Sequence, residues 1–188
     1  MPEIKKSGIF FFVVGPSGAG KDSLIDAAHA VLPSDKFVFA QRTITRPHGS
    51  PGEDHEACTE AEFQTRLSQN GFLIAWQAHG LHYGLSASLL EQMKQGRHVI
   101  ANGSRAMVAT LREKIPSLIV LEVSAPKNIL EKRLAARGRE TAEDVARRML
   151  RTVVDYPEGQ RVIRVMNDGT LEDGTERFIN AIEQQLSS

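Results

Sequence analysis

The segment Val13–Ser23 constrains this chain more than any other stretch of its sequence. It lies between an apolar run, Gly8–Val14, and a helical pattern, Leu24–Leu32, and it carries the spacing Gly-x-x-x-x-Gly-Lys. Between a strand and a helix, this spacing predicts a loop whose backbone N–H groups surround phosphate oxygens at the positive end of the helix. A glycine-rich turn without a ligand is disfavoured by that context. We therefore expect the loop to bind a nucleotide through Gly15, Pro16, Ser17, Gly18, Ala19, Gly20 and Lys21.

The residue after the lysine departs from the usual form of this loop, in which a Ser or Thr hydroxyl binds Mg²⁺. Here Asp22 occupies that position and Ser23 follows it. A carboxylate is also a hard oxygen ligand that suits Mg²⁺, so we expect Asp22, with Ser23 beside it, on the metal side of the nucleotide. Asp22 could equally cap the first turn of the helix, and the sequence leaves both interpretations open.

Length and composition narrow the class of protein. A chain of 188 residues fits one compact domain, and 23 basic against 23 acidic residues argue against a partner found by bulk charge, such as a nucleic acid or a membrane surface. The single cysteine, Cys58, allows no intrachain disulfide and favours a reducing compartment. The N-terminus shows no signal-peptide pattern and no stretch reaches membrane-spanning length, so we expect a cytoplasmic protein. A homodimer remains open.

Strand and helix patterns alternate along the chain, and the central strands are continuous apolar runs. This pattern predicts an α/β fold in three layers, with a mostly parallel central sheet covered by helices on both faces. Thr59 and Glu62 form a capping box that opens a helix, and Phe72–Ala78 is extended before a polar segment, His79–Gly84. Ligands bind such sheets beyond the carboxyl ends of the strands. The first loop, the segment after Arg42 and the run Asn102–Arg105 should therefore converge on one crevice.

Two groups of arginines suit anionic ligands. Arg133, Arg137 and Arg148 lie on either side of Gly138, where a lid could bring guanidinium groups onto a transferring phosphoryl group. A solvated basic helix paired with nearby acidic residues is the alternative.

Arg42 and Arg46 form the second group, which could hold a second anionic substrate or be a surface pair. His55, His79 and His82 lack metal-ligand spacing, so they are hydrogen-bonding groups for a polar substrate or ordinary surface residues. Trp76 is most simply part of the core.

Several of these motifs resemble the guanylate kinase family: Gly15–Lys21, Thr45-Arg46-Pro47, Tyr83-Gly84, and the run from Arg133 to Met149. The resemblance covers nearly the whole chain. It implies a P-loop kinase that uses ATP and Mg²⁺, with a core at 1–40 and 85–188, an acceptor-binding region at about 41–84 and a lid at about 137–148. It also implies that Asn167 lies on the adenine side of the nucleotide and that Arg133 serves nucleotide binding.

Departures from the family pattern concern the guanine site. Arg42 stands where guanylate kinases carry a serine, and Phe72–Gly84 contains no acidic residue to accept from a guanine base. Four further motifs are similar to those of ribose 1,5-bisphosphate phosphokinases, a branch of the family that serves phosphonate degradation: Lys21-Asp22-Ser23, Gly52–His55, Ala78–Gly84 and Asn102–Arg105.

This second resemblance implies that the chain transfers a phosphoryl group from ATP to ribose 1,5-bisphosphate and forms phosphoribosyl diphosphate. Lys21, Arg137 and Arg148 would be catalytic. The sugar bisphosphate would be bound by Arg42, Arg46, Asp54, His55, His79, Tyr83, Ser104 and Arg105. A nucleoside monophosphate kinase acting on GMP, and a guanylate kinase-like binding module without catalysis, are the alternatives.

Overall fold

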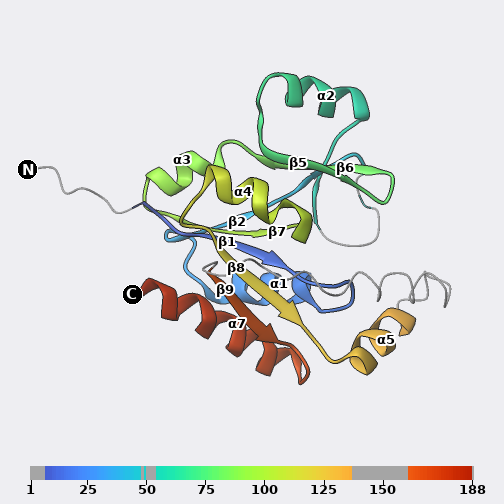
Figure 1. Cartoon of the computed structure of the whole chain (residues 1–188), viewed down its shortest axis with the longest axis vertical. Helices are drawn as coiled ribbons and strands as arrows, with labels where there is room; N and C mark the ends of the chain where they lie inside the picture. The colour runs from blue at the N-terminus through green and yellow to red at the C-terminus, as the bar shows by residue number, and fades with distance from the viewer. Residues whose placement is uncertain (1–6, 48, 50–53, 137–160, 188) are drawn as a thin grey trace, which may run out of the picture.

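Five parallel strands form the central sheet of the computed structural model, which describes residues 7–47, 49, 54–136 and 161–187. Their order in space is β2-β7-β1-β8-β9, so the first strand of the chain lies in the middle (Figure 1). The strands are β1 (Phe10–Val14), β2 (Phe37–Ala40), β7 (His98–Asn102), β8 (Ile119–Ser124) and β9 (Val162–Met166). The predicted parallel sheet is confirmed, and the loop that follows its central strand lies at the carboxyl edge.

Helices cover both faces of this sheet. In Figure 1, α1 (Lys21–Val31) and α7 (Leu171–Leu186) lie below the sheet, and the short helices α3 (Leu89–Lys94) and α4 (Val108–Lys114) lie above it. A 3-10 turn, Arg105–Met107, leads into α4. The helix α5 (Lys127–Ala136) follows β8 and packs Leu130 into the core between the sheet and the helices α1 and α7.

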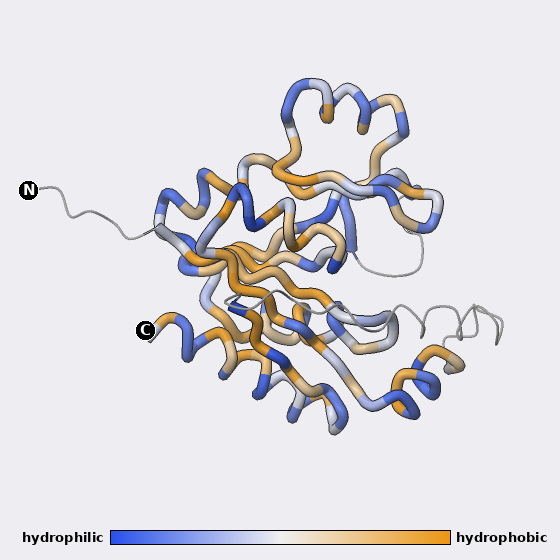
Figure 2. The backbone as a smooth tube through the Cα atoms, in the orientation of Figure 1, coloured by the Kyte–Doolittle hydropathy of each residue, from blue (hydrophilic) through white to orange (hydrophobic). Residues whose placement is uncertain are grey.

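The central strand explains why both faces are covered. All five residues of β1 are buried, and successive side chains of a strand point to opposite faces. Phe10 and Phe12 accordingly belong to the core beneath α3 and α4, whereas Phe11 and Val13 belong to the core against α1 and α7. Figure 2 shows the corresponding pattern, with apolar strands inside and polar helix surfaces outside.

A second, four-stranded sheet stands above the first. Its order is β4-β3-β6-β5, with β4 (Glu56–Ala57), β3 (Thr43–Ile44), β6 (Leu81–Ser86) and β5 (Phe72–Ala78). The pairs β3–β6 and β5–β6 are antiparallel, and β3–β4 is parallel. The helix α2 (Glu60–Ser68) covers this sheet and begins at the capping box predicted from Thr59 and Glu62.

The strands β3, β4 and β6 of the second sheet were not expected from the sequence. The polar segment after β5 forms the strand β6, because His79 and Gly80 adopt φ of 53° and 75° and reverse the chain in two residues. Positive φ at both central residues is typical of the turns that suit the twist of a β-hairpin. A histidine in this conformation is uncommon, which is why the turn is hard to recognise from the sequence.

His98, at the start of β7, is expected to make the free energy of unfolding depend on pH. The Ile9 backbone N–H donates to Nδ1 of His98 at 3.0 Å, and burial, together with Lys36, lowers the pKa of His98 below its ordinary 6.5. The folded state therefore binds fewer protons than the unfolded state as the pH falls through this range, so stability is full above about pH 6.5 and declines below it. Urea unfolding at pH 7.5 and 5.5 should show a larger loss for wild type than for His98→Gln. Equal losses would contradict this origin of the pH dependence.

Candidate active site

The loop between β1 and α1 holds Lys21 over its own backbone. Nζ of Lys21 donates to the carbonyl oxygens of Gly15 and Pro16, at 2.9 and 3.0 Å. Two glycines are required by the packing of the loop: a Cβ on Gly15 would lie 2.0 Å from the Val123 carbonyl oxygen, and one on Gly20, whose φ is 86°, would lie 2.5 Å from Nδ2 of Asn167. The loop thus places an ammonium group and the N-terminus of α1 at the same point, an arrangement suited to phosphate.

A cavity of about 480 Å³, named the main cavity, opens beside this loop. It is lined by the loop and the first turn of α1, by the second sheet, and by the segment after β7. The structure brings together there ten of the residues singled out in the sequence: Gly15, Pro16, Ser17, Lys21, Asp22, Arg42, His79, Tyr83, Ser104 and Arg105. Three cationic side chains face one carboxylate, so the cavity suits an anionic ligand.

Asp22 contacts the end of the neighbouring strand. Its Oδ1 accepts from Nδ2 of Asn102, and both residues line the cavity. The N-cap of α1 is Gly20, and Asp22 lies in the first turn of the helix, where no side-chain capping bond is formed. The metal-side role of Asp22 stays a prediction. Ser23, expected beside the metal, is exposed and does not line this cavity.

The oxygen donors of the cavity fit a hard cation. The Asp22 carboxylate, the Asn102 amide and the Ser104 hydroxyl are all oxygen-bearing groups of the kind that Mg²⁺ prefers. Among the described residues no group of three His, Cys, Asp or Glu is arranged to hold a metal ion. A Mg²⁺ ion would therefore need phosphate oxygens as well, which is the usual situation in kinases.

The second sheet contributes a stacked wall to the cavity. The rings of Trp76 and Tyr83 stack with centroids 5.4 Å apart and planes inclined by 10°, and the guanidinium of Arg42 lies over the Tyr83 ring, 5.5 Å from its centroid. A cation over an aromatic face is held by the ring quadrupole. His79, at the hairpin turn, completes this side of the cavity. Trp76 is buried, as expected of a core residue, but it also lines the cavity.

Arg46 lies apart from Arg42. It lines a second cavity, of about 550 Å³, together with Cys58 and the start of α2. His55 is buried and faces Arg46 with both ring nitrogens: Nδ1 lies 3.2 Å from Nη2 of Arg46, and Nε2 lies 3.1 Å from its carbonyl oxygen. A ring with its proton on Nε2 satisfies both contacts, since Nδ1 then accepts and Nε2–H donates.

Three of the expected substrate ligands, Arg46, Asp54 and His55, do not line the main cavity. His55 lines neither cavity and positions Arg46, and Asp54 is exposed, where its Oδ2 accepts from Nε2 of Gln41 at 3.0 Å. His82 also has a structural partner, because its Nδ1 lies 2.8 Å from Oε2 of Glu60.

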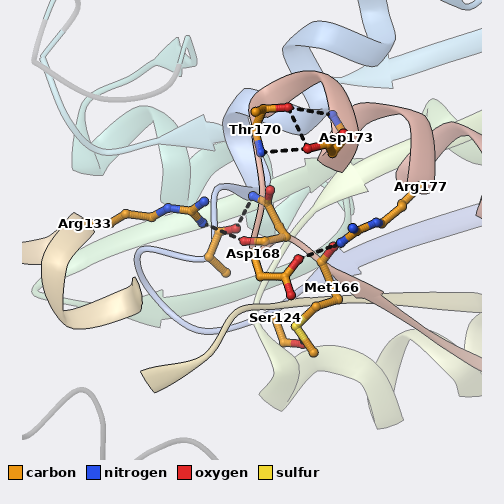
Figure 3. A network of polar contacts seen from close by, with 9 residues as sticks. Ser124, Arg133, Met166, Asp168, Thr170, Asp173 and Arg177 are labelled. Carbon is orange, nitrogen blue, oxygen red and sulfur yellow. Dashed lines mark hydrogen bonds and ion pairs between the residues drawn. The ribbon is translucent and has the colours of Figure 1, made fainter. Parts of the chain in front are cut away.

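Asn167 is hydrogen-bonded to the loop between β1 and α1. Its buried side chain donates from Nδ2 to the Ala19 carbonyl oxygen at 2.8 Å. The backbone carbonyl oxygen of Asn167 accepts from Nη1 of Arg133 at 3.0 Å. Figure 3 shows Arg133 reaching toward the turn that carries Asp168, where Arg177 forms an ion pair with Asp168 at 2.7 Å. Neither Arg133 nor Asn167 lines the main cavity. The expected adenine-side residue thus ties β9 to the phosphate-binding loop.

Asn167→Ala should therefore act through the loop. Removal of a buried hydrogen bond and its donor is expected to lower the free energy of unfolding by about 1–3 kcal/mol, and ATP affinity should fall with it because the Ala19 carbonyl loses its support. Urea unfolding and nucleotide titration measure the two effects. Weaker nucleotide binding at unchanged stability would instead indicate direct contact with the base.

The two lid arginines, Arg137 and Arg148, lie outside the described residues, as does all of the expected lid at 137–148. The helix α5, which leads toward it, ends at Ala136.

Comparison with known proteins identifies the fold. Residues 9–185 match the family model described as guanylate kinase. The chain belongs to the guanylate kinase family. Among solved structures, the guanylate kinase of Anaplasma phagocytophilum superposes with a TM-score of 0.70 at 13% identity, covering 97% of this chain and 88% of that one.

Relatives of this guanylate kinase family member carry a more specific name. This chain is 39% identical over 178 residues to a protein of Brucella melitensis named ribose 1,5-bisphosphate phosphokinase PhnN. The match covers 94% of this chain and 93% of the relative. This chain is also 56% identical over 182 residues to a protein of Azorhizobium caulinodans named bifunctional ribose 1,5-bisphosphokinase-thymidine phosphorylase. The chain spans 26% of that longer relative, and 30% of a similarly named one from Cupriavidus pinatubonensis.

Two features of the site beside the phosphate-binding loop were not predicted. Trp76 was assigned to the core alone, and the contact between Asn102 and Asp22 was not foreseen. The position of Asn102 at the carboxyl end of a strand beside β1 was the sequence signal for its contact with Asp22.

Within the described residues no helix is both long and apolar enough to cross a membrane.

Proposed function

We propose that the chain transfers the γ-phosphoryl group of ATP to the 1-phosphate of ribose 1,5-bisphosphate, giving ADP and phosphoribosyl diphosphate in phosphonate breakdown. The proposal is supported by relatives named ribose 1,5-bisphosphate phosphokinase, which this chain matches over nearly their whole length. We further propose that the reaction takes place in the cytoplasm.

The acceptor wall of the main cavity is the observation that carries the proposal. The second sheet contributes Arg42, Trp76, Ala78, His79 and Tyr83 to the lining, and none of them is acidic. A guanine base would present N–H donors to this wall without a carboxylate to accept them, which is unfavourable in a desolvated site. In addition, Arg42 covers one face of Tyr83 and supplies a positive charge that suits a phosphate.

The chemistry requires positioning more than proton transfer. The attacking oxygen belongs to a phosphate that is already ionised, so no general base is needed. The remaining task is to hold two anions close together and to stabilise the charge of the transferred group. In our proposal Lys21 leaves the carbonyl oxygens of the loop for the ATP phosphates, and the loop N–H groups hold them in place.

Metal and lid have separate roles in this proposal. When bound, Mg²⁺ would neutralise phosphate charge, and Asp22 is the residue that we assign to it, with Ser104 in the same cavity. Arg137 and Arg148 would close over the transferred group, and Arg133 would link the start of the lid to the loop through Asn167. On the acceptor side we assign Arg42, His79, Tyr83 and Arg105 to the sugar bisphosphate.

The product identifies the reaction. Incubation with ATP, Mg²⁺ and ribose 1,5-bisphosphate should produce ³¹P resonances of a diphosphate ester and of ADP in equal amounts. ADP formation without the diphosphate ester would indicate hydrolysis of ATP, and the proposal would then be wrong. Absence of any turnover together with absence of nucleotide binding would favour a non-catalytic module.

A further inference from the structure

Asp22 carries a carboxylate that P-loop proteins usually place at the strand end, where this chain has Asn102. In P-loop proteins a hydroxyl that follows the lysine and an aspartate at the end of a nearby strand hold Mg²⁺. Here the carboxylate follows Lys21 on α1, and the end of β7 carries an amide. The pair keeps the single negative charge of the usual arrangement but moves it from the strand to the helix.

The two side chains are in direct contact beside the phosphate-binding loop. Nδ2 of Asn102 donates to Oδ1 of Asp22, and both residues line the main cavity. Asn102 is the register partner of Val13 on β1, one residue before β1 ends and the loop begins. The Asn102 side chain is therefore held by the sheet, and through its hydrogen bond it fixes the orientation of the carboxylate.

The other end of the amide is unsatisfied. Asn102 is 7% exposed, and its Oδ1 is buried with no hydrogen-bond partner within the described part of the chain. A buried carbonyl oxygen without a partner destabilises the fold, and an apolar side chain of similar shape would avoid that loss. The fold alone does not call for an amide here, whereas an oxygen beside a carboxylate in a phosphate-binding cavity suits a cation.

We propose that Asp22 and Asn102 act as one unit toward the divalent cation that accompanies the nucleotide: the carboxylate supplies the charge and the amide positions it. This inference rests on the proposed function, because it requires a nucleotide in the loop. Since the unit carries one charge whichever residue bears it, exchange of the two side chains should preserve it. Asn and Asp have nearly the same shape, so the exchange leaves the packing of α1 and β7 intact.

The experiment measures affinity for the non-hydrolysable analogue AMP-PNP by calorimetry across a series of Mg²⁺ concentrations. For Asp22→Asn, the Mg²⁺ concentration of half-maximal effect should rise about 10- to 100-fold. In the double variant Asp22→Asn/Asn102→Asp it should return to within about threefold of wild type, because the two changes are coupled. Asn102→Asp alone should bind Mg²⁺ at least as tightly as wild type, because it adds a second carboxylate.

Thermal unfolding of each variant separates this role from a structural one. If the pair only joins α1 to β7, the variants will unfold earlier while the Mg²⁺ dependence stays unchanged, and the inference is then overturned. A double variant no tighter for Mg²⁺ than Asp22→Asn would overturn it as well. Wild-type protein that binds no AMP-PNP at any Mg²⁺ concentration would contradict the proposed function itself, and the inference with it.

Discussion

Lys21→Ala is expected to lower kcat/KM for phosphoryl transfer by about 10³-fold or more, since preorganised charge at the transferred group commonly supplies an effect of this size. In the structure Nζ of Lys21 lies within 3.0 Å of two carbonyl oxygens of the loop, so the ammonium is already at the mouth of the phosphate-binding loop. No other lysine lines the main cavity among the described residues, and none there could replace it. Steady-state kinetics with a coupled ADP assay measures the change.

The control for this variant addresses the loop itself. Lys21 donates two hydrogen bonds to the loop, so its removal could also loosen the backbone, and circular dichroism with thermal unfolding must show that the fold survives. Lys94→Ala removes an exposed lysine paired with Glu91 far from the cavity, and it should leave turnover unchanged. Turnover of a folded Lys21→Ala protein close to that of wild type would remove Lys21 from the mechanism.

Arg42→Ser should raise the KM for ribose 1,5-bisphosphate about 10- to 100-fold, because a hydrogen bond to a charged group contributes about 1.5–3 kcal/mol. The guanidinium lies over Tyr83 on the second-sheet wall of the cavity, whereas Lys21 lies on the loop after β1, so KM for ATP should change little. Loss of the cation also exposes the face of Tyr83, and the KM for GMP should fall or stay constant. Initial rates with each substrate varied in turn measure these effects.

Arg164→Ser is the matched control, because it removes an exposed arginine that pairs with Glu122 on β8 and β9. Its KM for the sugar bisphosphate should equal that of wild type. If Arg42→Ser behaves in the same way as this control, Arg42 does not contact the acceptor. The proposal that this side of the cavity binds the sugar bisphosphate through a positive charge would then be wrong.

The sequence was sufficient wherever one local rule decides the structure. The strand before Gly15, the loop and the lysine follow from spacing alone, and the capping box at Thr59 fixes the start of α2. The parallel sheet follows from continuous apolar strands such as β1. These features depend on near neighbours in the chain, which a sequence pattern records.

The remainder depends on contacts between distant segments. His55 was predicted to bind the substrate, and the contacts of both its ring nitrogens with Arg46, nine residues away, were not foreseen. Asn102 meets Asp22 across 80 positions of sequence, and Asn167 reaches Ala19 across 148. No spacing rule predicts such pairs, because they are set by strand order and register.

The ratio of kcat/KM for ribose 1,5-bisphosphate to kcat/KM for GMP, measured with ATP and Mg²⁺ under identical conditions, tests the central claim most directly. A wall with Arg42 over Tyr83 and no acidic side chain predicts a ratio of about 10³ or more in favour of the sugar bisphosphate, since a buried donor without an acceptor is strongly rejected. A ratio below one would show that the cavity accepts a purine, and the chain would then be a nucleoside monophosphate kinase.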